Sequence, residues 1–163
     1  MDVVAKFDVL GPLQWIAMPI KKRGTFNPKK EVSVMAWIEN DSHEVLFVRQ
    51  AAGLRLWTLP GGKVKRNESL ERALKREVRE ETGLKVSDLS YLKIYDRPKR
   101  GAVTILFWVS VERRTTHVQF PIEEIADLGF FSDLPGKVTP SAKFFWDWRQ
   151  SSITRVSAQP SSS

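Results

Sequence analysis

The sequence predicts an α/β fold, a sandwich of helices around a mixed β-sheet. Two observations predict it: strand-like apolar runs recur on both sides of one strongly helical segment over 69–82, and a second helical segment from Pro140 follows the last run. With 163 residues, of which 42% are hydrophobic and 28% charged, the chain has the size and composition of one globular domain.

The elements follow in order along the chain. Residues 1–30 are predicted to form an N-terminal arm, in which 13–20 could add a strand. The main domain is predicted to span 31–150, with strands over 32–39, 45–50, 91–95, 103–111 and 127–132. The run over 103–111, VTILFWVSV, is almost wholly apolar, as expected of a strand that is covered on both faces. A helix is expected to begin at Pro140, and a disordered Ser-rich tail over 151–163.

The segment Ser69 to Thr82 is predicted to be the central helix. Ser69 suits its N-cap, and Gly83 suits a left-handed end. Four apolar residues recur at helical spacing and are expected to face the core: Leu70, Ala73, Leu74 and Val78.

Three acidic residues share one surface of this helix. Glu77, Glu80 and Glu81 lie at i, i+3 and i+4, so their carboxylates project close together and repel one another. Neighbouring basic residues could compensate them, as on an ordinary solvated helix face. The alternative is a hard divalent cation, because Mg²⁺ prefers carboxylate oxygen and shares its ligands with substrate phosphates. The absence of cysteine and the presence of only two histidines argue against a zinc site.

The segment just before the helix favours the cation. The run WTLPGG over 57–62 is strand-like and is interrupted by Pro60, Gly61 and Gly62. Glycine lets a backbone bend sharply and approach a ligand closely. A metal–phosphate site needs such a loop, because backbone and carboxylate oxygens must meet in one small volume, whereas a solvated helix face does not.

A longer pattern includes both segments. Between Gly62 and Leu84, GKVKRNESLERALKREVREETGL satisfies G-x5-E-x7-R-E-U-x-E-E-x-G-U, where U is aliphatic. This is the Nudix box, and the chain resembles the Nudix hydrolases. The resemblance implies the Nudix fold, an α/β/α sandwich around a mixed β-sheet. It also implies hydrolysis of a nucleoside diphosphate linked to a further group X, by water attack on one phosphorus, with Mg²⁺ as the cofactor and Mn²⁺ as its substitute.

The resemblance also implies roles for the matching residues. The metal ligands implied by position are Gly62, through backbone oxygen, and Glu77, Glu80 and Glu81. Arg76 resembles the arginine that holds the glutamates in place, the alternative being an ordinary surface ion pair. Glu68 is expected to support the metal site or its loop.

The catalytic base stays open. Family members use either a box glutamate, here Glu77 or Glu80, or a glutamate from a later loop. Glu123 and Glu124 precede the predicted strand at 127–132 and suit the second role, unless they form an exposed acidic turn. The candidate catalytic residues are therefore Arg76, Glu77, Glu80 and Glu124.

Substrate contacts are expected from Trp57, Gly61 and Arg49. The Trp57 ring could stack on a base, although such rings more often belong to the core. The expected substrate is a nucleoside triphosphate, an oxidised nucleotide or a nucleotide sugar such as ADP-ribose. Two alternatives stay open: a hydrolase of dinucleoside polyphosphates or capped RNA, and a non-catalytic nucleotide sensor.

The formal net charge of +7 favours anionic partners. Basic residues group at 21–30 and again at Arg97, Lys99 and Arg100, but they are dispersed over loops and no nucleic-acid motif is present. A small nucleotide is therefore expected as the partner rather than a nucleic acid. No run approaches the roughly 20 apolar residues that cross a bilayer, so no membrane partner is expected. A cytoplasmic location is predicted, and a homodimer is left open.

Overall fold

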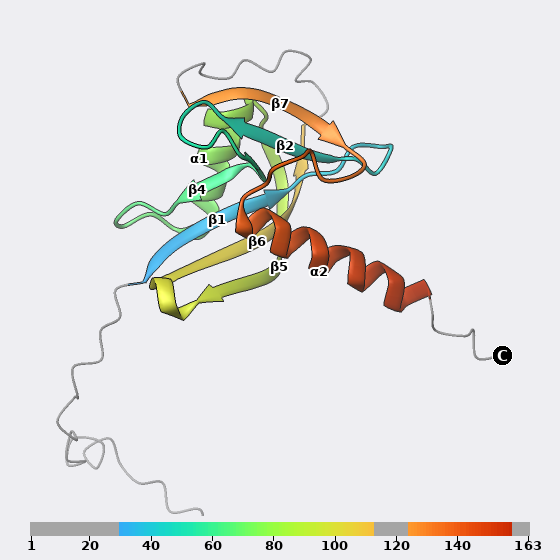
Figure 1. Ribbon diagram of the computed structural model, residues 1–163. Coiled ribbons are helices and arrows are strands. Elements are labelled where there is room, and N and C mark those ends of the chain that lie inside the picture. The colour runs from blue at the N-terminus through green and yellow to red at the C-terminus, as the bar shows by residue number, and fades with distance from the viewer. Residues whose placement is uncertain (1–29, 113–123, 158–163) are drawn as a thin grey trace, which may run out of the picture.

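The computed structural model describes residues 30–112 and 124–157. Residues 1–29 of the predicted arm, Glu123 and residues 158–163 of the predicted tail therefore lie outside the described residues. The elements, most of them labelled in Figure 1, are β1 (Glu31–Trp37), β2 (Val45–Gln50), β3 (Trp57–Thr58), β4 (Gly61–Lys63), α1 (Leu70–Thr82), β5 (Val86–Arg97), the 3₁₀ turn η2 (Pro98–Arg100), β6 (Ala102–Val111), β7 (Ile125–Phe131) and α2 (Pro140–Ser157).

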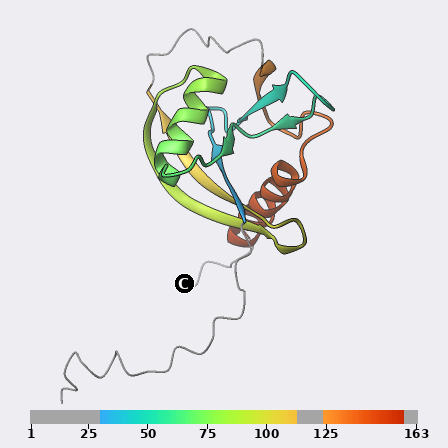
Figure 2. The same ribbon diagram turned by 90° about the vertical axis from the view of Figure 1, so that its left-hand side faces the viewer.

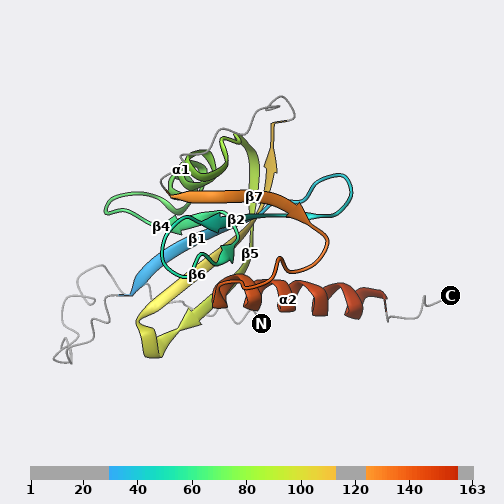
Figure 3. The ribbon, with the colours of Figure 1, turned by 45° about the horizontal axis from the view of Figure 1, so that its top comes forward.

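The strands divide between two sheets. A four-stranded mixed sheet has the order β4-β1-β6-β5, in which β1 and β6 are parallel and the other neighbours antiparallel. A three-stranded antiparallel sheet has the order β3-β2-β7, and Figure 3 shows β7 crossing the molecule above β2. The predicted α/β class with a mixed sheet is confirmed. The apolar patterns of the strands do not indicate that they divide between two sheets.

The two helices cover opposite faces of the mixed sheet, as Figures 1 and 2 show. Ala36 of β1 and Phe107 of β6 pack in the cluster that contains α1. Their sequence neighbours Trp37 and Leu106 pack in the other cluster, with Phe145 of α2. Successive side chains of a strand point to opposite faces, so β1 and β6 contribute to both cores. This explains the continuous apolar run of β6.

Helix α1 begins and ends as predicted. The Ser69 hydroxyl oxygen accepts a hydrogen bond from Arg72 N, and Gly83 ends the helix with φ 72° and its N–H bonded to Arg79 O. Three of the four expected core residues are fully buried: Ala73, Leu74 and Val78. The expectation for Leu70 is wrong, because this first residue of α1 is 37% exposed and the helix meets the core one turn later.

Strand β5 is much longer than the predicted 91–95. Its pairing with β6 shifts register between Val86 and Asp88 and again between Tyr91 and Lys93. Such bulges place consecutive residues out of alternation, so the polar and apolar pattern does not indicate the full strand.

Helix α2 begins at Pro140 as predicted and continues to Ser157, past the boundary predicted at residue 151. The Ser151 and Ser152 hydroxyls donate to the carbonyls of Asp147 and Trp148, four residues earlier, which makes these serines compatible with a helix. None of the helices in the described ranges has the length and apolar character needed to span a membrane.

Candidate active site

The site begins at β4, where two glycines are required for different reasons. Gly61 has φ 149°, a conformation that side chains rarely adopt, and a Cβ there would collide with the carbonyl oxygen of Val34 on β1. At Gly62 an added Cβ would lie 2.6 Å from both Cδ and Oε1 of Glu77. The absent side chain at Gly62 therefore leaves the space in which a carboxylate from α1 lies against the backbone of β4.

Arg76 connects the acidic residues to the loop before the helix. Its Nε and Nη2 donate to the two carboxylate oxygens of Glu68 at 2.8 and 2.9 Å. Its Nη1 donates to Glu77 Oε1 at 2.7 Å and to Glu80 Oε2 at 3.1 Å. Nη2 also donates to the Lys63 carbonyl at 3.2 Å, so all five guanidinium N–H groups have an acceptor. These partners raise the pKa of Arg76 above its ordinary value.

Glu68 fixes the loop on which Arg76 depends. Besides holding Arg76 with both oxygens, its carboxylate accepts the Lys65 backbone N–H at 2.9 Å. The hydrogen bonds from Arg76, and then from Lys65, lower the pKa of Glu68 to about 2. Glu68 is thus a permanently ionised part of the loop at neutral pH.

Glu81 contacts the backbone of β4 and has a raised pKa. Its Oε2 accepts the Gly61 N–H at 2.8 Å. Burial raises the pKa of Glu81 to about 8; the Gly61 hydrogen bond opposes the rise, while repulsion from Glu77, Glu124 and Glu80 adds to it. A positive charge beside Glu81 would stabilise its ionised form.

These groups form a donor set of oxygens, which is the chemistry that a hard divalent cation prefers. In the present arrangement Arg76 holds Glu77 and Glu80 while Glu81 turns to Gly61. Across the described residues, no three acidic or histidine side chains converge closely enough to ligate one ion as they stand. The fit to a cation comes from the donor chemistry and from the glycine backbone against Glu77, where a Cβ would fill the space.

Glu124 lies near this site although it is distant in sequence. Its carbonyl accepts the Ala51 N–H at 2.9 Å at the start of β7, and its exposed carboxylate is near enough to contribute to the raised pKa of Glu81. With Gln50, Ala52 and Gly53 it lines a cavity of about 440 Å³. No motif in the sequence singles out Gln50, the last residue of β2, or Ala52 and Gly53 of the β2–β3 loop, which share this cavity.

The expected substrate contacts already have partners within the protein. Arg49 and Trp57 face each other across β2 and β3, with the Arg49 guanidinium 5.5 Å from the Trp57 ring centroid and 3.1 Å from Asp127. The Trp57 ring also lies against Phe131, at 4.9 Å between centroids. The Gly61 N–H is donated to Glu81. Gly61 is thus the candidate that contacts a glutamate of the box directly, whereas Arg49 pairs with Asp127.

A model of the NUDIX domain matches residues 29–134, about two thirds of the chain. The chain belongs to the Nudix family. Members of this family generally use a divalent metal ion.

Curated relatives of this Nudix chain include two named enzymes. The 8-oxo-dGTP diphosphatase of Proteus vulgaris is 33% identical over 90 residues, covering 52% of this chain and 80% of that protein. The RNA pyrophosphohydrolase of Teredinibacter turnerae is 40% identical over 57 residues, covering 35% of this chain and 33% of that protein. The chain spans about half or less of the length of the first curated relatives it matches.

Solved structures agree on the Nudix fold. The MutT NUDIX hydrolase from Burkholderia pseudomallei superposes with a TM-score of 0.64 at 24% identity, covering 72% of this chain and 96% of that one. The NUDIX domain of Shewanella oneidensis NrtR, solved with ADP ribose, gives 0.61 at 18% identity, covering 88% and 99%. At these identities the similarity concerns the fold.

Within this Nudix domain, β4 and α1 bring the box residues together. Gly62 lies against Glu77, Gly61 bonds Glu81, and Arg76 joins Glu77 to Glu80. The sequence could not predict that the Lys63 carbonyl accepts a hydrogen bond from Arg76, because every residue type has a backbone carbonyl.

Proposed function

We propose that this Nudix protein is a pyrophosphohydrolase that cleaves the diphosphate linkage of a nucleoside diphosphate joined to a further group. Its ion is Mg²⁺, with Mn²⁺ as a substitute. The main supporting observation is the Glu77 carboxylate packed against Gly62, with Glu80 and Glu81 on the same surface of α1. That arrangement offers acidic oxygens beside a backbone without side chains, which suits a cation shared with a diphosphate.

The box residues would divide the work between them. Glu77, Glu80, Glu81 and backbone oxygen at Gly62 would hold the ion. When bound, a divalent ion neutralises phosphate oxygens and lowers the pKa of bound water. Arg76 acts as a positioning residue, because its guanidinium donates hydrogen bonds to both Glu68 and Glu77 and so fixes one carboxylate relative to the other.

Two exposed carboxylates are candidates to accept the proton of the attacking water. Glu80 lies on the open side of α1, and Glu124 lines the neighbouring cavity. The pH–rate profiles of Glu80→Gln and Glu124→Gln separate them: loss of the base removes the acidic limb of the profile in one variant and leaves it in the other.

An oxidised nucleoside triphosphate such as 8-oxo-dGTP is the preferred substrate. The relative with this named activity is covered over 80% of its length. RNA with a 5′ pyrophosphate is the second candidate, because the RNA pyrophosphohydrolase of Teredinibacter turnerae is 40% identical over the matched segment. A non-catalytic sensor is disfavoured by the complete set of box glutamates, which a binder would not need.

The test is hydrolysis in Mg²⁺ of 8-oxo-dGTP, dGTP, ADP-ribose, a diadenosine polyphosphate and 5′-triphosphorylated RNA. Glu80→Gln is expected to fold normally and to lower turnover by about a thousandfold. This factor corresponds to the loss of several kcal/mol of transition-state stabilisation by the ion, at about 1.4 kcal/mol for each tenfold in rate. Glu71→Gln is the matched control, because Glu71 is exposed on the same helix and pairs with Lys75. A folded Glu80→Gln with near wild-type turnover would contradict the assignment, and no turnover on any substrate would favour the sensor.

A further inference from the structure

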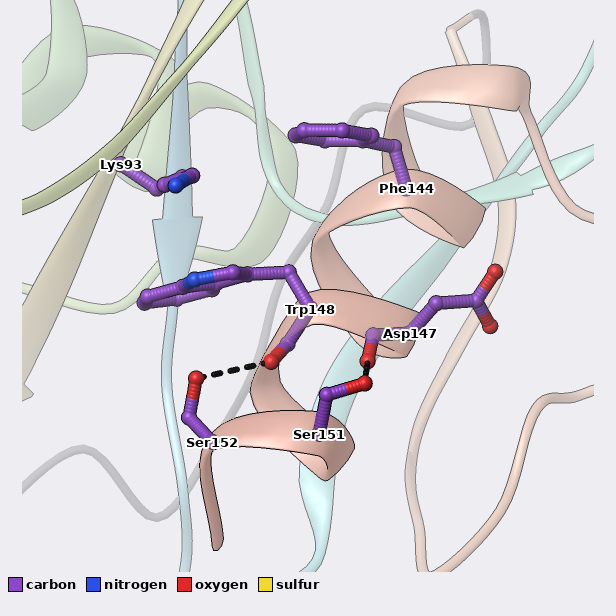
Figure 4. Close-up of a pocket in the computed structure, with 6 residues that line it drawn as sticks. All are labelled: Lys93, Phe144, Asp147, Trp148, Ser151 and Ser152. Atoms are coloured by element: carbon purple, nitrogen blue, oxygen red, sulfur yellow. Dashed lines mark hydrogen bonds between the residues drawn. The ribbon is translucent and has the colours of Figure 1, made fainter. Parts of the chain in front are cut away.

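A cavity of about 440 Å³ lies between α2 and β5, on the face of the mixed sheet opposite α1. Figure 4 shows the residues that line it: Lys93 from β5 and Phe144, Asp147, Trp148, Ser151 and Ser152 from α2. The Nudix box contributes no residue to this cavity, so it is separate from the proposed catalytic site.

Aromatic rings form one side of the cavity. Phe144 and Trp148 are one turn apart on α2, and both rings extend toward the strand that carries Lys93 (Figure 4). Phe144 is also stacked on Tyr95 of β5, with 4.1 Å between centroids and an interplanar angle of 12°. The Arg97 guanidinium lies 5.4 Å from the Tyr95 centroid. A planar group that enters the cavity beside Phe144 would lengthen an existing stack.

Cations accompany these rings along β5. Lys93 Nζ lies 5.5 Å from the Trp148 ring centroid. Lys93, Tyr95 and Arg97 alternate onto the face toward α2, and the strand covers about 13 Å between the two cations. Lys99 and Arg100 follow, exposed, in η2.

Phe144 and Trp148 of α2, together with Lys93, Tyr95 and Arg97 of β5 and the η2 residues Lys99 and Arg100, form a track of rings and cations. The positive charge of this track is not neutralised within the described part of the chain. No carboxylate there lies within ion-pair distance of Lys93, Arg97, Lys99 or Arg100. The two nearby acids already have lysine partners: Asp147 pairs with Lys143 at 2.8 Å and Asp96 with Lys30 at 2.7 Å. A cationic ligand would be repelled, so the track favours an anion that also presents flat rings.

We propose that this track binds single-stranded nucleic acid, with an unstacked base in the cavity between Phe144 and Trp148 and with phosphates along Lys93, Arg97 and η2. Ring faces interleaved with cations are the means by which proteins hold single strands without reading their sequence. In the sequence, the dispersal of the basic residues along the chain argues against a nucleic-acid partner. The fold, however, brings Lys93, Arg97 and the basic residues of η2 together beside the rings of α2. A mononucleotide would leave the cations beyond the cavity without a phosphate.

The test measures fluorescence anisotropy of 5′-labelled U12 RNA, T12 DNA and a hairpin duplex with the full chain, in EDTA and at 50 to 200 mM KCl. Both single strands are expected to bind more tightly than the duplex. Trp148→Ala is expected to weaken single-strand binding about tenfold through lost stacking. Lys93→Gln is expected to reduce the slope of log affinity against log salt by about 0.7. A preference for RNA or for DNA identifies the natural strand, and either supports the proposal.

Lys75→Gln is the matched control, because it removes the same charge from α1 on the opposite face of the sheet. Lys75→Gln is expected to leave the salt slope unchanged, and Trp148→Ala to keep wild-type turnover of a mononucleotide, which separates this site from the proposed function. Equal losses in Lys93→Gln and Lys75→Gln would overturn the proposal. So would equal binding of the duplex, or equal competition by poly-glutamate, which has charge but no rings. If Trp148→Ala fails to fold, the comparison of the two lysine variants decides.

Discussion

Substitution of Gly62 by alanine tests the geometry of the box most directly. The new Cβ would lie 2.6 Å from Glu77 Cδ and Oε1, whereas ordinary contacts begin at 3.4 Å. The Glu77 carboxylate therefore has to withdraw by about 0.8 Å, and its 2.7 Å bond from Arg76 Nη1 is distorted as it moves. A displacement near 1 Å at a reacting centre costs about a hundredfold in rate, so turnover is expected to fall by that factor.

The assay compares kcat for the best substrate, affinity for Mg²⁺ and the thermal midpoint of unfolding. Gly62→Ala is expected to weaken Mg²⁺ binding and turnover while the midpoint changes little, because the residue keeps its place opposite Val34 in β4. Gly136→Ala is the matched control: Gly136 has φ 73° and open space around an added Cβ, so strain costs stability without touching the carboxylates. The reasoning is refuted if folded Gly62→Ala turns over at the wild-type rate.

Three further outcomes are expected. Arg76→Lys cannot hold Glu68 with two parallel bonds, and turnover should fall about 10- to 100-fold in steady-state assays while Mg²⁺ still binds at higher concentration. The pKa of Glu81 is about 8 in the folded protein, against an ordinary value of 4.5, so the folded state holds its proton more tightly than the unfolded state. The free energy of unfolding of the metal-free protein, measured by urea titration, should therefore fall as pH rises from about 4.5 to 8. Glu81→Gln should flatten this pH profile, and an unchanged slope in the variant would contradict the account. Phe145→Ala empties a fully buried site in the α2 cluster and should lower the free energy of unfolding by about 3–5 kcal/mol in the same titration.

Local signals predicted the elements that depend on neighbours in sequence. The N-cap at Ser69 and the left-handed end at Gly83 belong to residues whose preference is set by their own backbone geometry, and both are where expected. Leu70 shows the limit of the same reasoning, because it has the helical spacing of the core residues and is nevertheless exposed. Helical spacing predicts which face of a helix is buried, but not how much of the length of that face contacts the core. The bulges of β5 are likewise set by pairing with β6, which no local pattern records.

The sequence by itself determined which chemistry is present: three carboxylates on one helical turn, an arginine beside them, and a glycine pair before them, because helical periodicity and residue type are local properties. Only the tertiary structure decided what those groups touch. The Gly62 space filled by Glu77, the five hydrogen bonds of Arg76 and the raised pKa of Glu81 all arise from the way β4, the loop after it and α1 pack together. The same holds for Lys93 and Trp148, whose contact joins a strand to a helix far along the chain. Burial and proximity of distant segments are properties of the packed chain, and they set the geometry and charge of both sites.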